Sequence, residues 1–275
     1  MNTTIKQYFA NKASKYDDVD LQPYWLFSDE LLWYILQNKI FSKNNNTKFN
    51  FLDVGAGTGR WSIKTLEAYP NSYASLVDIS HEMIDIARLK LEKKIFTNRF
   101  NIEIDDARQL NHIKDKEFDI IFCLHNVIGF FDETIIAISN FYKKLKENGK
   151  CAVMFPSYYH SIYFSNTTNR IEQLDEIEKN HKVQYNDTMP PLKVFEISDI
   201  EYLQKESGFK NVSCYGFPIT LYPGMEETFV HGSTANIVNL LESNHQSKLL
   251  EIEKKLCLQS KLSSRGNNII AIFEK

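Results

Sequence analysis

The sequence predicts an α/β protein built on an open, doubly wound sheet, and three observations support this prediction. Strand-like apolar runs alternate with helical segments between residues 49 and 155. The apolar run at residues 49–54 leads directly into three closely spaced glycines and then a helix. With 275 residues, the chain is long enough for one large domain of this class. We therefore expect a mainly parallel sheet with helices on both faces.

Composition and charge narrow the kind of protein. Hydrophobic residues make up 43% of the chain and charged residues 24%, which allows a sizeable core. The net charge of −3 argues against general nucleic-acid binding, which needs a basic face. The N-terminus has no signal-peptide core, and no apolar run reaches the length of a membrane span. We expect a cytoplasmic protein that binds neither nucleic acid nor membrane.

The four cysteines lie far apart in the sequence, without the spacing of a metal site or a redox motif. Cys123 and Cys151 fall inside apolar strand-like runs, where a thiol acts as a small hydrophobic side chain. We therefore predict no metal.

The first 46 residues are expected to form a helical cap. Residues 1–20 predict a short helix that ends near Tyr16. Residues 21–40 predict an amphipathic helix, with Ser28 as a candidate cap followed by Asp29 and Glu30 in the first turn. A polar loop at residues 42–48 then leads to the sheet.

The first strand ends in the sequence Asp53-Val-Gly55-Ala-Gly57-Thr-Gly59. Glycine allows positive φ and a close approach of another group to the backbone. The spacing differs from the Gly-x-Gly-x-x-Gly fingerprint of dinucleotide sites, because Arg60 stands at the position of its third glycine. The alternative is an ordinary strand-to-helix turn that needs glycine only for its geometry.

The remaining elements follow in alternation. We predict a helix at 61–69, a strand at 73–78, a helix at 81–94 capped by Ser80, strands at 100–104 and 118–124, a helix at 133–147 closed by Asn148-Gly149, and a strand at 150–155. Residues 156–197 break the pattern and are interpreted as an irregular lid insertion. A helix at 198–207, a strand at 211–215, two helices within 235–260 and a last strand at 268–273 complete the chain.

Two acidic positions follow strands of the predicted sheet. Asp78 ends the second strand, where a carboxylate can accept hydrogen bonds from the two hydroxyls of a ribose. A plain helix-capping acid is the alternative. Asp106, with Ala107 after it, follows the third strand and could accept from an adenine amino group, with Asp105 as the second choice. A solvated loop acid is the alternative there.

Leu124, His125 and Asn126 leave the fourth strand at the sheet edge where ligands of open α/β sheets bind. This segment should face the reacting group. His125 could accept or relay a proton. It could equally line the pocket or cap a helix.

These stretches together resemble the class I S-adenosylmethionine-dependent methyltransferases. The resemblance covers roughly residues 49–216 and includes the glycine turn, Asp78 with Ile79 and Met83, Asp106-Ala107 and the strand at 118–123. It implies a Rossmann-like sheet of seven strands in the order 3-2-1-4-5-7-6, with the last strand antiparallel. It also implies S-adenosyl-L-methionine as cofactor: Asp53, Gly55, Gly57 and Gly59 would line its methionine part, Asp78 its ribose and Asp106 its adenine. Leu124 and Asn126 would complete the cofactor site.

The N-terminal cap also resembles that of many small-molecule members, through Tyr8-Phe9, Lys12-Ala13 and Tyr16-Asp17. An aromatic ring such as that of Tyr16 attracts a sulfonium cation by about 0.5–2 kcal/mol. Packing within the cap is the alternative reading of these aromatic side chains.

The expected function is methyl transfer to a nitrogen or oxygen atom of a small acceptor, with amines among the candidates. His125 and Tyr159 are the first choices for a catalytic base, followed by His160 and His231. Tyr158, Tyr159, Tyr163 and the pair Glu226-Glu227 are expected around the acceptor. The alternatives are a cofactor-binding module without chemistry of its own, or an NAD-dependent oxidoreductase on a similar fold.

Overall fold

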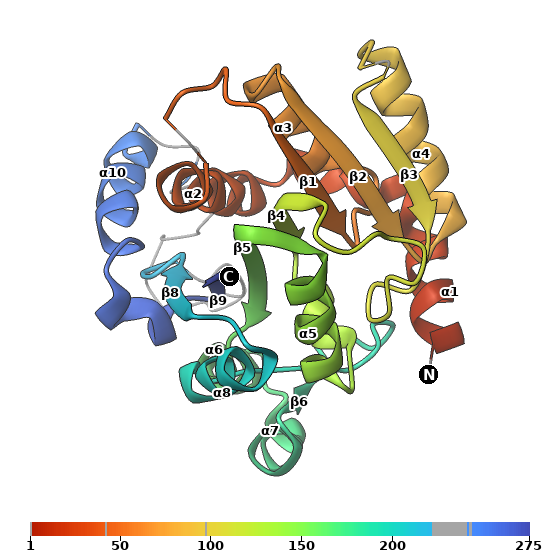
Figure 1. Cartoon of the computed structure of the whole chain (residues 1–275). Helices are drawn as coiled ribbons and strands as arrows, with labels where there is room; N and C mark the ends of the chain where they lie inside the picture. The colour runs from red at the N-terminus through yellow and green to blue at the C-terminus, as the bar shows by residue number, and fades with distance from the viewer. Residues whose placement is uncertain (1, 42, 97, 222–240, 242–243) are drawn as a thin grey trace.

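A computed structural model describes residues 2–41, 43–96, 98–221, 241 and 244–275. Its centre is a seven-stranded sheet in the order β3-β2-β1-β4-β5-β9-β8 (Figure 1). The strands are β1 Phe49–Val54, β2 Ser72–Asp78, β3 Phe100–Ile104, β4 Phe118–Cys123, β5 Leu145–Pro156, β8 Asn211–Phe217 and β9 Asn268–Glu274. β9 is antiparallel to both β5 and β8, and the other neighbouring pairs are parallel. The predicted order is confirmed, because the short hairpin β6 Lys182–Val183 and β7 Leu192–Lys193 only shifts the numbering.

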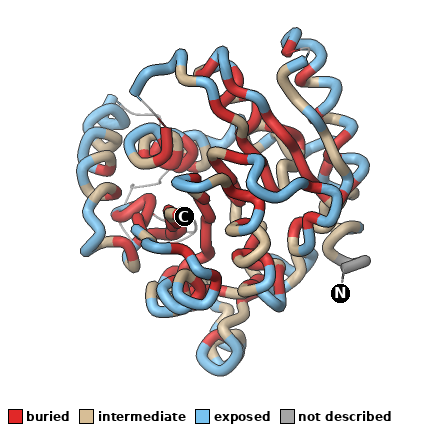
Figure 2. Tube along the Cα trace, viewed as in Figure 1, coloured by how far each residue is buried: buried red, intermediate tan, exposed pale blue. Residues whose placement is uncertain are grey.

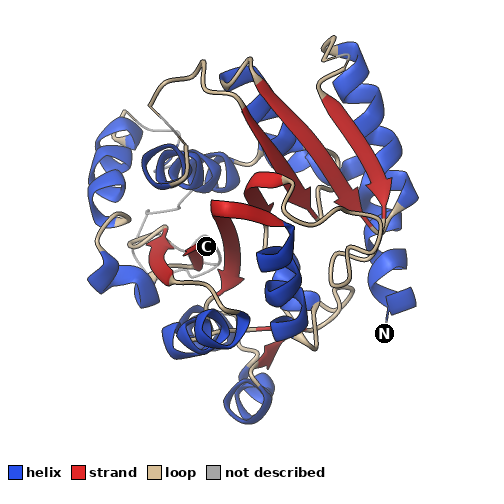
Figure 3. Cartoon of the chain, viewed as in Figure 1, coloured by secondary structure: helices blue, strands red, loops and turns tan. Residues whose placement is uncertain are grey.

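Helices cover both faces of this sheet (Figure 3). The described α-helices are α1 Asn2–Lys12, α2 Pro23–Lys39, α3 Arg60–Ala68, α4 His81–Lys93, α5 Thr134–Lys144, α6 Tyr158–Thr167, α7 Leu174–Asn180, α8 Ile197–Ser207 and α10 Gln246–Leu256. The 3-10 helices are η1 Ala13–Leu21, η2 Val127–Phe130, η3 Ile171–Gln173 and η4 Ser260–Arg265. Among the described helices, none is long and apolar enough to cross a membrane.

The core consists of two layers, one on each face of the sheet, and both lie within the buried centre in Figure 2. Alternate strand residues enter alternate layers: Phe51 and Phe122 pack under α2 and α3, whereas Leu52 and Ile121 pack under α5 and α8. Both layers exclude water, so the central strands are apolar at nearly every position. This burial accounts for the continuous hydrophobic runs in the sequence.

Several predicted boundaries are correct because local signals decide them. Ser80 caps α4, and its hydroxyl accepts a hydrogen bond from the backbone N–H of Met83. Gly208 ends α8 with a positive φ of 89°. The bounds of β1 and β3 are also confirmed.

Three predictions about elements are wrong. Ser28 is not a cap: α2 begins at Pro23, whose fixed φ suits a first helical position, and Ser28 is buried inside the helix. α5 ends at Lys144, since Leu145 already pairs with Phe118 and the residues up to 149 belong to an irregular start of β5.

The third correction concerns residues 156–197, which are ordered rather than irregular. They form α6, η3, α7 and the β6–β7 hairpin around a small core of their own. That core contains Ile177, Val183, Leu192 and Val194. Of the two helices expected within 235–260, α10 is present, and the first falls outside the described residues.

Candidate cofactor and acceptor site

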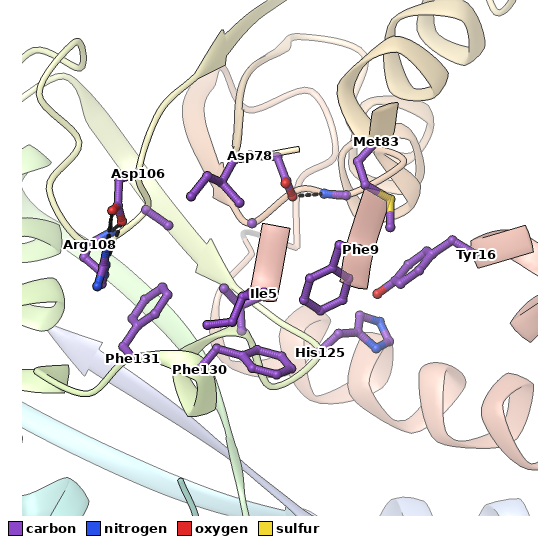
Figure 4. A pocket seen from close by; sticks show the side chains of 15 residues that line it. Ile5, Phe9, Tyr16, Asp78, Met83, Asp106, Arg108, His125, Phe130 and Phe131 are labelled. Atoms are coloured by element: carbon purple, nitrogen blue, oxygen red, sulfur yellow. Dashed lines mark hydrogen bonds and ion pairs between the residues drawn. The ribbon is translucent and has the colours of Figure 1, made fainter. Parts of the chain in front are cut away.

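The carboxyl ends of β1, β2, β3 and β4 surround a cavity of about 740 Å³, part of it open to solvent. This edge lies where the strand order reverses between β1 and β4, the usual ligand site of open α/β sheets. Figure 4 shows the side chains that line it. They are Ile5, Phe9, Tyr16, Gly55, Gly57, Asp78, Ile79, Met83, Asp106, Ala107, Arg108, His125, Val127, Phe130 and Phe131.

Asp78 is the acidic centre of this cavity. Its Oδ2 accepts the backbone N–H of Gly57 at 2.8 Å, and its Oδ1 accepts that of Ser80 at 2.9 Å. Burial raises the pKa of Asp78, and the two backbone donors oppose that rise. Each carboxylate oxygen keeps further lone-pair capacity, so two neighbouring hydroxyl groups fit this acceptor.

The glycine turn reaches the cavity through Gly55 and Gly57, both with positive φ. A Cβ on Gly57 would meet only the ring of Tyr16, at 3.8 Å, so the space above this residue is open. A Cβ on Gly55 would approach the Val127 methyl groups to 2.7 Å. Gly59 has a different role: it precedes α3, and a Cβ there would press on Ala87 of α4 at 3.2 Å.

Asp106 and Arg108 lie together at one side of the cavity (Figure 4). The guanidinium Nε donates to Asp106 Oδ1 at 2.9 Å, and the second guanidinium nitrogen, Nη2, also contacts this carboxylate. Arg108 lowers the pKa of Asp106 by hydrogen bonding, so this carboxylate stays ionised. The sequence analysis did not select Arg108, although its position two residues after Asp106 was a usable signal.

Aromatic side chains from distant parts of the chain close the cavity. Phe9 of α1 packs edge-on against Phe130 of η2, with ring centroids 5.3 Å apart. Tyr16 of η1 faces the glycine turn, and burial raises its pKa to about 12, so its hydroxyl stays protonated. Phe130 and Phe131 were missed from the sequence, where nothing distinguishes them from core residues.

A second cavity adjoins the first and shares four lining residues with it, Phe9, Tyr16, His125 and Phe130. Its other side chains come from the cap, the α6–β7 segment and the start of β9. They are Tyr8, Asn11, Lys12, Lys15, Asp18, Val19, Gln22, Trp25, Arg60, Asn126, Met154, His160, Phe164, Tyr185, Asn186, Met189, Leu192, Asn267 and Asn268. The shared wall allows two molecules to meet at His125.

His125 is held by a polar cluster. Trp61 Nε1 donates a hydrogen bond to His125 Nε2, and Asp29 Oδ1 lies 3.6 Å from the same nitrogen. Arg60 bridges Asp29 and Asp20. Burial lowers the pKa of His125, and the Asp29 carboxylate opposes that shift. The ring is therefore neutral at neutral pH.

Asn126 lines the second cavity rather than the first. Its Nδ2 donates to Asn268 Oδ1 at 2.9 Å, which joins the end of β4 to the start of β9. Both His125 and Asn126 have left-handed backbone conformations, with φ of 50° and 62°. Such strain in a non-glycine residue is typical of functional positions.

Four other predicted site residues lie outside the lining of these two cavities. Asp53 is buried beneath the turn, where it accepts a hydrogen bond from Ser62 at 2.6 Å, and burial raises its pKa to about 6. Leu124 is a core residue, and Gly59 serves helix packing. Tyr159 is half exposed and donates to Glu196 at 2.8 Å, away from both cavities.

Several residues expected around the acceptor do not line the second cavity, and other side chains of the same segment line it instead. His160, Phe164 and Tyr185 line the second cavity, whereas Tyr158 and Tyr163 do not. His231 and the pair Glu226-Glu227 lie outside the described residues. Among the described side chains, no group of three or more candidate ligands could hold a metal ion.

Residues 51–149 match a family model described as a methyltransferase domain. This part of the chain is thus similar to a methyltransferase domain. The match spans the glycine turn, Asp78, Asp106 and His125. The seven-stranded sheet, with its one antiparallel strand, has the Rossmann-like fold of class I methyltransferases.

A curated relative of the methyltransferase domain is malonyl-[acyl-carrier protein] O-methyltransferase 1 of Ilyobacter polytropus, 29% identical over 161 residues. That alignment covers 58% of this chain and 54% of the relative. The chain thus aligns with about half the length of this curated relative.

Solved structures share the fold. One is an S-adenosylmethionine-dependent methyltransferase of Thermotoga maritima, with a TM-score of 0.60 and 16% identity over 98% of this chain and 99% of that one. Another is phosphoethanolamine N-methyltransferase 2 of Haemonchus contortus in complex with S-adenosyl-L-methionine. Its TM-score is 0.55 at 17% identity, over 90% of this chain and 52% of that one.

Proposed function

We propose that this protein transfers the methyl group of S-adenosylmethionine to a small acceptor. The observation that carries the proposal is the cavity in which Asp78 and the backbone of Gly57 meet, beside a second cavity that shares His125. The cofactor supplies a methyl group on positively charged sulfur, which an acceptor lone pair can attack.

Each part of the first cavity suits a part of the cofactor. Asp78 would hold the ribose hydroxyls, and Asp106 with Ala107 would meet the adenine. The open space above Gly57 would take the methionine part, beside the Tyr16 ring. The protein then contributes by holding both reactants aligned, which lowers the barrier by several kcal/mol.

We also propose that the chain is a single domain in which residues 1–46 form a cap and residues 156–197 a lid over the acceptor. Cap and lid side chains line the second cavity together, including Tyr16, Trp25, Phe164 and Tyr185. A concave site lined from both of these segments supports a small acceptor rather than a macromolecule.

Calorimetric titration with S-adenosylmethionine, S-adenosylhomocysteine and NADH tests the cofactor. Binding of the first two but not of NADH is expected, and the reverse would overturn the proposal. Transfer of a labelled methyl group is then measured over carboxylates, phenols and amines. Binding without transfer across this panel would favour a cofactor-binding module without chemistry of its own.

A further inference from the structure

The hydrogen bond between Trp61 and His125 decides which ring nitrogen carries the proton. An indole N–H can only donate, so His125 Nε2 must offer it a lone pair. A neutral imidazole has one N–H and one lone pair, so the proton is then on Nδ1. In this arrangement neither ring nitrogen has a lone pair left for a substrate proton.

Burial, more than the charged groups around it, keeps His125 neutral. Asp29 of α2 and Asp20 of η1 favour the charged ring, whereas burial and Arg60 of α3 disfavour it. Arg60 also neutralises both carboxylates through its ion pairs. A histidine in this setting has a pKa below its ordinary value and is a poor general base.

His160, the other histidine of the described acceptor cavity, is a poor base as well. His160 is buried, and burial lowers its pKa to about 3. Asp18 lies exposed at the cavity wall, with Lys12 and Lys15 also exposed nearby in the sequence. Arg60 is already paired with Asp20 and Asp29. In the rest of the described lining, Lys12 and Lys15 carry two positive charges against the one negative charge of Asp18.

We propose that Trp61 fixes His125 as a hydrogen-bond donor, and that the acceptor is a carboxylate, which His125 Nδ1–H orients. This inference rests on the proposed function and deepens it. Alcohols, phenols and protonated amines must lose a proton before or during methyl transfer, whereas a carboxylate is already ionised at neutral pH. The positive lining also suits an anion.

The step balances without a base. A carboxylate oxygen lone pair forms the new O–C bond, the S–C bond breaks, and its electron pair goes to sulfur. The products are a neutral methyl ester and a neutral thioether, and no proton is released. His125 is a positioning residue in this step, because it orients the oxygen and exchanges no proton.

The tautomer is tested first, by NMR of protein labelled with ¹⁵N in histidine and loaded with S-adenosylhomocysteine. Wild-type His125 should carry its proton on Nδ1, and its pKa should lie below the ordinary value. Trp61→Phe removes the donor and should raise that pKa. The matched control is Trp33→Phe, because the Trp33 ring packs beside Trp61, whereas the described hydrogen bond to His125 comes from Trp61. A wild-type proton on Nε2, or equal pKa values in the two variants, would overturn the donor role.

The acceptor is tested with benzoate, phenol and benzylamine as probes at matched concentrations. Binding is measured on protein loaded with S-adenosylhomocysteine, where benzoate should bind roughly tenfold more tightly than benzylamine. Turnover is measured with S-adenosylmethionine in place of S-adenosylhomocysteine, and benzoate should then be converted to its methyl ester without proton release. Preference for benzylamine or phenol, or failure of benzoate to bind, would overturn the proposal that the acceptor is a carboxylate. Failure of S-adenosylhomocysteine itself to bind would instead refute the proposed function, and calorimetry separates the two results.

Discussion

At the scale of single residues, Asp78 is the best defined contact for the cofactor. Asp78→Asn should weaken S-adenosylhomocysteine binding by about 10–100-fold, since hydrogen bonds to a charged group contribute about 1.5–3 kcal/mol. Calorimetry checks this. Asp85→Asn is the matched control, because Asp85 lies on the exposed face of α4 and outside the cavity lining. Equal affinities in the two variants would remove Asp78 from the ribose site.

Tyr16 gives a test that depends on charge. S-adenosylmethionine carries a positive sulfur, whereas S-adenosylhomocysteine is neutral. Tyr16→Leu should therefore weaken binding of S-adenosylmethionine more than that of S-adenosylhomocysteine, by about 2–30-fold in the ratio of the two affinities. Competition titrations measure that ratio. An unchanged ratio would mean that Tyr16 only packs against the cap.

Residue types with a fixed physical role were predictable from the sequence. Asp78 and Gly57, which meet at the cavity, could be selected from the sequence because a carboxylate and a glycine have few other roles at strand ends. Phe130 was not predictable, because its role depends on contact with Phe9 of α1, far away in the sequence. Arg108 was missed although its partner Asp106 is only two residues away. The neutral state of His125 likewise depends on its burial in the folded chain, which no local pattern predicts.

At the scale of elements, the glycine turn allows a comparison between two neighbouring positions. Gly57→Ala places a methyl group in open space and should mainly cost cofactor affinity, with about 1–2 kcal/mol of backbone strain. Gly55→Ala meets Val127 at 2.7 Å and should reduce the free energy of unfolding further. Thermal unfolding and calorimetry on both variants separate these effects.

The control for this comparison is the double variant Gly55→Ala with Val127→Ala. It removes the two methyl groups that the new Cβ would meet. Part of the lost stability should return, although the backbone strain remains. If the double variant is less stable than Gly55→Ala alone, contact with Val127 is not the cause.

Elements with strong local signals were predicted well, and those decided by neighbours were not. Ser80 caps α4 through its own side chain. The start of β5 depends instead on pairing of Leu145 with Phe118, so a helix continuing to residue 147 was the wrong interpretation. The lid residues 156–197 lack the strict periodicity of a long helix, and their small core forms only when α7 and the β6–β7 hairpin meet.

At the scale of the whole molecule, His160, which lines the second cavity, makes the free energy of unfolding depend on pH. Its pKa is lowered to about 3 in the folded state, from 6.5. The unfolded chain therefore binds more protons between these values, so the free energy of unfolding falls as pH falls below about 6.5. Between about pH 6.5 and pH 5, this group accounts for a loss of about 2 kcal/mol.

Denaturant unfolding of wild type and His160→Phe at several pH values measures this contribution. The variant should lose less stability on acidification, by about that amount. His81→Gln serves as the control, since His81 is exposed on α4. Parallel pH curves for wild type and His160→Phe would show that His160 is not the group that titrates.

Alternating strands and helices predicted a mainly parallel sheet, whereas the strand order of the whole sheet was predicted through the resemblance to class I methyltransferases. Which distant residues meet at the cavity could not be predicted, since cap, lid and β9 approach one another only in the folded molecule. The shared wall at His125 is the clearest example.

The bond from Asn126 to Asn268 spans 142 positions of the sequence. During translation the glycine turn and Asp78 are synthesised well before β9. A nascent chain can thus contain the strand ends around the first cavity while one wall of the second cavity is still missing. By the proposed mechanism, methyl transfer would begin only after β9 has paired between β5 and β8.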